Sequence, residues 1–103
     1  MWDTPSPSRH SYKVLVDDNF HYMDPSERYQ LGEFDTCEMA VTACKRVVDK
    51  FLSSSNPSGK TAEELWEGYV MFGDDPFIAT TDPNCSFSAW DYARQRCAEI
   101  GRP

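Results

Sequence analysis

The hydrophobic pattern of this chain changes its period at Asp35, and this change constrains the fold more than any other feature. Residues 29–34 alternate between apolar and polar side chains, which is the two-residue period of a β-strand. From Cys37 to Leu52 the apolar residues recur at steps of three and four, which predicts an α-helix with one face toward a core. A strand that leads straight into a long helix predicts an α+β domain in which the helix packs on a sheet.

The start of this helix also carries a local signal. Asp35 can accept hydrogen bonds from free backbone N–H groups, and Glu38 can reach back, at the spacing of a capping box. Phe34 before the cap and Met39 after it have the spacing of a hydrophobic staple. We therefore expect Asp35 to cap the helix.

The remaining sequence predicts two more strands and two more helices. Tyr12, Val14 and Val16 fall on one face of a short strand. Thr61 and Ser88 each precede a helical apolar pattern, with an acidic residue three positions later. The expected segments are a strand at 12–16, a helix from 61 to 72, a strand at 77–81 and a helix from 88 to 100. Their order is β-β-α-α-β-α, which suits a small, mostly antiparallel sheet with the helices packed on one face.

The length of 103 residues suits one domain with a core of its own. We expect a single α+β domain at residues 12–101 and a short tail at 102–103. Residues 1–11 hold two prolines and three serines without an apolar period, and we expect them to form a flexible leader.

Charge and cysteine content exclude some classes of function. The net charge of −7 opposes direct binding to the phosphates of a nucleic acid. No apolar run approaches the roughly 20 residues of a membrane span, and no signal peptide pattern is present, so we expect a cytoplasmic protein without a membrane segment. The four cysteines lack the close spacing of a metal site, and buried, reduced thiols are favoured over disulfides.

The connection between the first two strands, residues 17–28, is the candidate functional surface. It gathers acidic, imidazole and aromatic side chains in a predicted loop and not on a predicted core face. The candidate binding residues are Asp17, Asp18, His21, Tyr22 and Asp24. Phe20 and Met23 either fold back over the sheet or join that surface, since burying a Phe side chain contributes about 1.5–3 kcal/mol. A structural interpretation also stands, in which the acidic side chains cap local N–H groups in a solvated turn.

Catalytic and ligand motifs do not account for this loop. A calcium loop that starts at Asp17 would place His21, and at its last position Arg28, where oxygen ligands are needed. No phosphate-cradling, dinucleotide-binding or zinc-protease motif occurs in the chain. Neither His10 nor His21 has a glycine-rich elbow or an oxyanion-hole motif nearby, so we expect no enzyme and no cofactor. A thiol enzyme would require an exposed cysteine of low pKa.

The segment from Val16 to Asp24 (VDDNFHYMD), together with the stretch from Glu27 to Asp35, resembles short uncharacterised proteins and domains of bacterial origin. The resemblance implies a small stand-alone domain and supplies no activity, ligand or catalytic residue. The residues themselves predict a non-enzymatic protein-interaction or regulatory module that uses loop 17–28. The alternative is a protein that binds a small ligand or a divalent metal through the same loop.

Overall fold

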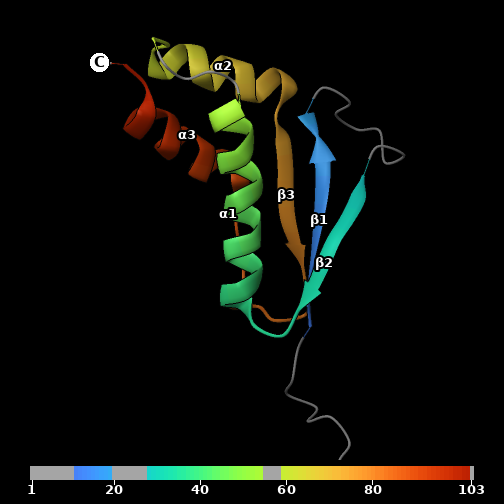
Figure 1. Ribbon diagram of the computed structural model, residues 1–103. Coiled ribbons are helices and arrows are strands. Elements are labelled where there is room, and N and C mark those ends of the chain that lie inside the picture. The colour runs from blue at the N-terminus through green and yellow to red at the C-terminus, as the bar shows by residue number, and fades with distance from the viewer. Residues whose placement is uncertain (1–10, 20–27, 55–58, 103) are drawn as a thin grey trace, which may run out of the picture.

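The sheet is built from three antiparallel strands in the order β2-β1-β3 (Figure 1). The computed structural model describes residues 11–19, 28–54 and 59–102. β1 (Tyr12–Asp18) lies in the middle of the sheet, and β2 (Tyr29–Phe34) and β3 (Asp74–Ala79) flank it. The observed order of elements is β-β-α-α-β-α, so the predicted α+β class and element order are confirmed.

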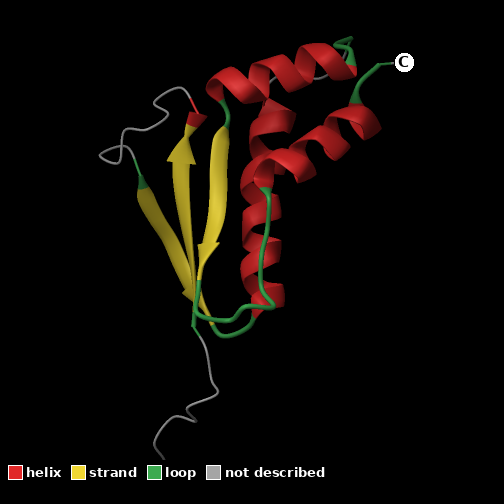
Figure 2. Cartoon of the chain, turned by 180° about the vertical axis from the view of Figure 1, so that it is seen from behind, coloured by secondary structure: helices red, strands yellow, loops and turns green. Residues whose placement is uncertain are grey.

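Within the described residues, three helices lie on the same side of this sheet, and the opposite face carries no helix (Figures 1 and 2). They are α1 (Cys37–Ser54), α2 (Ala62–Phe72) and α3 (Ala89–Ile100). α1 makes its most extensive sheet contacts with β3, and α3 packs on α1 and α2. Because α1 leans toward β3, the β2 side of the sheet is the less covered one.

The core lies between the inner face of the sheet and the helices. Val14 and Val16 are fully buried there, as their predicted shared face requires. Tyr69 of α2 is also fully buried, and its hydroxyl donates to the Asp74 carbonyl oxygen at 2.7 Å. The Asn19 amide donates to the Tyr69 carbonyl oxygen at 2.9 Å. These two hydrogen bonds join the end of β1, the helix α2 and the start of β3.

The predicted cap of α1 is wrong by one residue. The helix begins at Cys37, and the Met39 N–H donates to the Thr36 hydroxyl at 3.1 Å, so Thr36 and not Asp35 caps it. β2 continues to Phe34, and the chain uses the next two residues to bend from the strand into the helix. Both Asp and Thr are good capping residues, so local preference did not decide between them.

The third strand begins three residues earlier than predicted. It runs through Asp74, Asp75 and Pro76, which in the sequence look like a break. β3 is an edge strand, where proline is tolerated because a nitrogen that faces away from the neighbouring strand forfeits no ladder hydrogen bond. Pro76 pairs with Val16 and is fully buried, so packing overrides the local turn preference.

The expectation of four reduced thiols is wrong for one pair of cysteines. Cys37 and Cys85 form a disulfide that joins the first residue of α1 to the connection between β3 and α3. That connection returns to the start of α1, which brings two cysteines 48 residues apart to a Cα separation of 5.8 Å. Cys44 and Cys97 are buried and reduced, as predicted.

Among the described residues, no helix combines the length and the apolar character that crossing a lipid bilayer requires.

Candidate binding groove

The structure describes only part of the predicted binding loop. Asp17 and Asp18 form the end of β1, the central strand, where the loop starts. The other three predicted binding residues, His21, Tyr22 and Asp24, lie outside the described residues, as do Phe20 and Met23. The role assigned to these five residues stays a prediction.

Asp17 takes part in a contact on the open face of the sheet. The Arg28 guanidinium donates to both of its carboxylate oxygens, at 2.6 and 3.1 Å, and lies 5.0 Å from the centre of the Phe77 ring. This hydrogen bond raises the pKa of Arg28. The pair connects the end of β1 to the residue before β2, so Asp17 has a structural role there.

Two pairs of aspartates lie opposite each other where β1 ends and β3 begins. Asp17 pairs with Asp75, and Asp18 pairs with Asp74. Burial raises the pKa of both Asp74 and Asp75, and the neighbouring carboxylates of Asp18 and Asp17 raise it further. The described residues hold no group of three or more His, Cys, Asp or Glu side chains suited to a metal ion. The alternative of a metal site in loop 17–28 therefore stays a prediction.

β2 presents an open edge. Within the described residues, β1 is the only strand that pairs with it, and its other edge has no partner strand. Side chains on this strand are unusually exposed for their size: Tyr29 is 50% exposed and Leu31 42%. An edge strand with free N–H and C=O groups is a template for another strand unless charge, proline or a covering element protects it. Glu33 is the only charged residue within β2.

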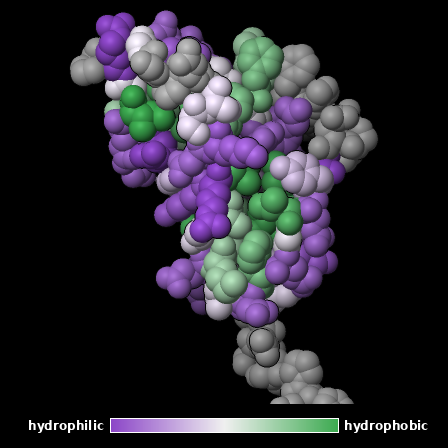
Figure 3. All heavy atoms as spheres, in the orientation of Figure 1, coloured by the Kyte–Doolittle hydropathy of each residue, from purple (hydrophilic) through white to green (hydrophobic). Residues whose placement is uncertain are grey.

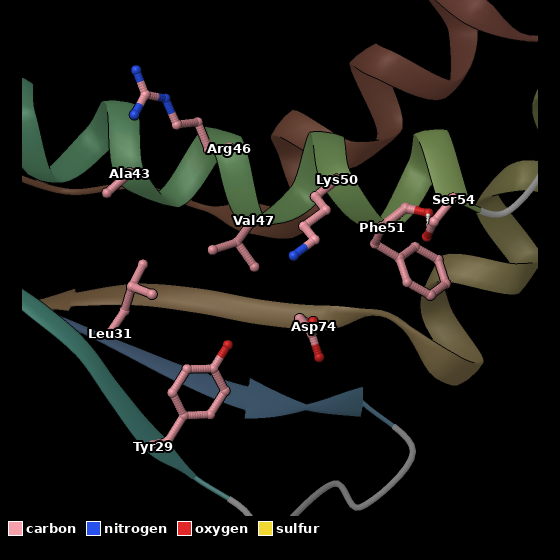
Figure 4. Close-up of a pocket in the computed structure, with 9 residues that line it drawn as sticks. All are labelled: Tyr29, Leu31, Ala43, Arg46, Val47, Lys50, Phe51, Ser54 and Asp74. Carbon is pink, nitrogen blue, oxygen red and sulfur yellow. Dashed lines mark hydrogen bonds between the residues drawn. The ribbon is translucent and has the colours of Figure 1, made fainter.

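A groove runs between this open strand and α1. Its first hollow has a volume of about 370 Å³. Tyr29 and Leu31 point into it from β2, and Val47 points down into it from α1 (Figure 4). The Arg46 guanidinium points away from it, so only the stem of that side chain borders the hollow (Figure 4). The groove is therefore apolar along its middle.

One end of the groove is polar. Lys50 extends from α1 toward the sheet, and Asp74 of β3 lies across from it (Figure 4). The Lys50 ammonium lowers the pKa of Asp74, against the larger effect of burial. Burial and the Asp74 carboxylate raise the pKa of Tyr29. A cation, an anion and a phenol thus meet at the end where loop 17–28 leads into β2.

A second hollow continues the groove toward the other end of β2. It also has a volume of about 370 Å³, and it shares Ala43 and Arg46 with the first hollow. Phe34 closes it on the strand side, and Met39, which is 50% exposed, borders it on the helix side. The space-filling view of this face shows apolar side chains in a band flanked by polar ones (Figure 3). The groove is therefore as long as the strand beside it.

The cysteines offer no reactive thiolate. Cys37 and Cys85 are bonded to each other. Cys44 is fully buried, and burial raises its pKa to about 12. Burial raises the pKa of Cys97 as well. A thiol enzyme needs an exposed cysteine of low pKa, and none of the four has these properties.

Sequence reasoning found two residues of the groove and missed the groove itself. The alternation of 29–34 placed Tyr29 and Leu31 on one face of a strand. It could not show that β2 lies at the edge of the sheet or that α1 leans toward β3, because both depend on the order of the strands. The sequence did hold one signal of the groove, because residues 29–34 carry a single charged side chain. Exposed edge strands usually carry more charged side chains, which discourage pairing with another strand.

No known protein family, curated protein or solved structure matches this chain. The resemblance to uncharacterised bacterial proteins stays a prediction.

Proposed function

We propose that the protein is a protein-interaction module that binds an extended segment of a partner along β2 and in the groove between β2 and α1. The observation that carries this proposal is the coincidence of two features. Of the two edge strands, β2 is the one that exposes Tyr29 and Leu31 beside an apolar groove of its own length. Each feature alone is common in small domains, but together they form a docking surface.

The physical basis is strand addition. A partner segment beside β2 gains backbone hydrogen bonds along six residues, and these hydrogen bonds require no particular sequence. Alternate side chains of the partner then face the α1 side, where the groove is apolar. Apolar partner residues gain there from burial against Leu31 and Val47, at about 25 cal/mol per Å² of apolar surface removed from water. The groove therefore selects for extended segments with apolar residues at alternate positions.

The predicted loop keeps a place in this proposal. Loop 17–28 leads directly into Tyr29, at the polar end of the groove that holds Lys50 and Asp74. The candidate residues of the loop would then contact the end of a bound segment, while the groove supplies the main surface. This order of importance reverses the expectation from the sequence.

The experiment is a selection of displayed random peptides on the immobilised protein at nanomolar concentration, followed by affinity measurements on two variants. Val47→Asp places a charge in the groove. Val70→Asp is the matched control, because Val70 is also half-buried and lines a separate apolar hollow on α2. We expect the selected peptides to lose about tenfold or more in affinity for Val47→Asp and to bind Val70→Asp as they bind the wild type. Peptides that bind Val47→Asp unchanged would refute the proposal, provided both variants keep the wild-type circular dichroism spectrum.

The predicted cytoplasmic location implies a reducing environment, whereas the disulfide implies an oxidising one. Disulfides persist in oxidising compartments and are rare where glutathione keeps thiols reduced. The bond between Cys37 and Cys85 therefore favours an oxidising compartment over the predicted location. Alkylation of free thiols in cells lysed directly into denaturant, followed by mass spectrometry, decides between them: a reduced protein carries four labels, and a protein with the disulfide carries two, on Cys44 and Cys97.

A further inference from the structure

The pairing of β2 with β1 assigns each residue of β2 to a face of the sheet. Tyr29, Gly32 and Phe34 pair with the β1 residues that are buried beneath the helices, so they lie on the inner face. Gln30 and Glu33 pair with the β1 residues on the opposite side, so they lie on the outer face. Two residues on neighbouring strands that pair directly across a ladder lie on the same face of the sheet, so this assignment is unambiguous.

Leu31 is the exception to strict alternation. The register shifts between Val14 and Leu15, so that Gly32 pairs with Val14 and Gln30 with Leu15, and Leu31 is the extra residue of a bulge. Its side chain points into the groove, on the inner face (Figure 4). Along β2 the faces therefore run inner, outer, inner, inner, outer, inner. This pattern is the same when it is read in either direction.

We propose that the partner segment in the groove is β2 of a second copy of this chain, paired antiparallel about a two-fold axis between Leu31 and Gly32. This inference rests on the proposed function, whose surface it assigns to a definite partner. In this register each residue of one β2 meets a residue of the other that lies on the same face. A shift by one or two residues sets inner residues against outer ones, which a one-sided sheet does not tolerate.

The side chains that meet in this register are complementary. On the inner face Tyr29 meets Phe34 of the second copy, and Leu31 meets Gly32, against which the Phe34 ring of the same strand lies. Aromatic pairs across strands are among the favourable ones. The wider set of opposed pairs is Tyr29 with Phe34, Gln30 with Glu33, Leu31 with Gly32, and, just beyond the strand, Arg28 with Asp35. No pair brings like charges together, although the protein carries a net charge of −7.

The exposure of the surface fits this partner. Tyr29 and Leu31 are half exposed in the single chain, and a second β2 would cover both. The pairing is isologous, so the same six residues supply both halves of the contact and the assembly closes at two copies. The result is one continuous sheet of six strands, with both α1 helices on the same face and no β2 edge left open.

The test begins with the mass of the full chain in solution, measured by sedimentation equilibrium from micromolar to millimolar concentration. We expect a dimer that Leu31→Lys converts to a monomer at every concentration, because two lysines would then lie diagonally across the two-fold axis on the same face. Met71→Lys is the control, since Met71 is an exposed apolar residue of α2, 61% exposed and away from β2. A wild type that is monomeric throughout, or a dimer that survives Leu31→Lys, overturns the inference.

The register is tested separately with two variants that each add one cysteine on the outer face, Gln30→Cys and Glu33→Cys. Residues directly opposite across antiparallel strands have Cα atoms about 4.5–5.5 Å apart, which is within the range of a disulfide. Mild oxidation of an equal mixture should therefore give a covalent dimer of one variant with the other, and oxidation of either variant alone should give little. Equal yields from the mixture and from the single variants overturn the register.

These outcomes separate the inference from the proposed function. A monomeric wild type whose displayed peptides still depend on Val47 removes the second copy and retains the docking surface. If the displayed peptides bind Val47→Asp as tightly as the wild type, and Leu31→Lys disrupts a wild-type dimer, the second copy remains the partner of β2 and the binding of other extended segments is ruled out.

Discussion

Reduction of the disulfide between Cys37 and Cys85 should destabilise the protein by about 4 kcal/mol. The bond closes a loop of 48 residues that contains α1, α2 and β3. The loop-closure relation gives an entropy of about 13.6 cal/mol/K for a loop of this length, which is about 4 kcal/mol at about 25 °C. A domain of this size has a stability of only about 5–15 kcal/mol, so a loss of about 4 kcal/mol removes a large share of it.

The assay is urea unfolding followed by circular dichroism, with and without a phosphine reductant. The wild type should lose its stability increment when it is reduced. The Cys37→Ser, Cys85→Ser double variant should match the reduced wild type and should not respond to the reductant. Cys44 and Cys97 serve as an internal control, because both are buried and reduced in the folded protein and only unfolding exposes them to alkylation.

Two results would refute this reasoning. Intact mass spectrometry of the native protein could show four free thiols, in which case the bond does not form. Alternatively, the oxidised and reduced proteins could unfold within about 1 kcal/mol of each other. The second result would mean that the unfolded chain is already compact around this loop, since the calculated gain assumes a free unfolded chain.

Four substitutions test other parts of the structure by urea unfolding. Asp75→Asn should stabilise the protein at neutral pH, because burial holds the carboxyl pKa above its ordinary 3.8 in the folded state, so ionisation opposes folding as pH rises through that window. The gain should vanish below pH 3.8, and an equal gain at all pH values would contradict it. Thr36→Ala should cost about 1 kcal/mol and Asp35→Ala much less, whereas the reverse order would restore Asp35 as the cap. Leu52→Ala should cost about 2–5 kcal/mol, since Leu52 is 1% exposed; a cost near zero would mean that the core is not packed as described.

Local chemistry was sufficient to predict most of the helices and two of the strands. Thr61 and Glu64 form both hydrogen bonds of the expected capping box, at 3.1 and 2.9 Å. Ser88 accepts from the Asp91 N–H at 3.2 Å, as its position before the last helix predicted. These signals depend on residues three positions apart, and at these two helices no distant contact displaces them.

The errors arose where distant residues decide the outcome. Pro76 enters β3 because Val16 lies opposite to it, and no local pattern around Asp74 and Asp75 reports that contact. The pairing of Cys37 with Cys85 likewise depends on the return of the chain from β3 to the start of α1. Sequence spacing could count the cysteines but could not bring two of them together.

In β2, which borders the candidate groove, the local pattern predicted some features correctly and missed one that depends on the neighbouring strand. Alternation correctly placed Tyr29 and Leu31 on a common face, and it predicted a regular strand through Phe34. The bulge at Leu31 breaks that regularity, and it is the bulge that makes the order of faces along β2 identical in both directions. In a regular six-residue strand the first residue lies on one face of the sheet and the last residue on the other. Two antiparallel copies of such a strand could therefore pair inner residues with inner residues only after a shift in register. The self-complementary edge is therefore a consequence of one residue that departs from the pattern used to find the strand.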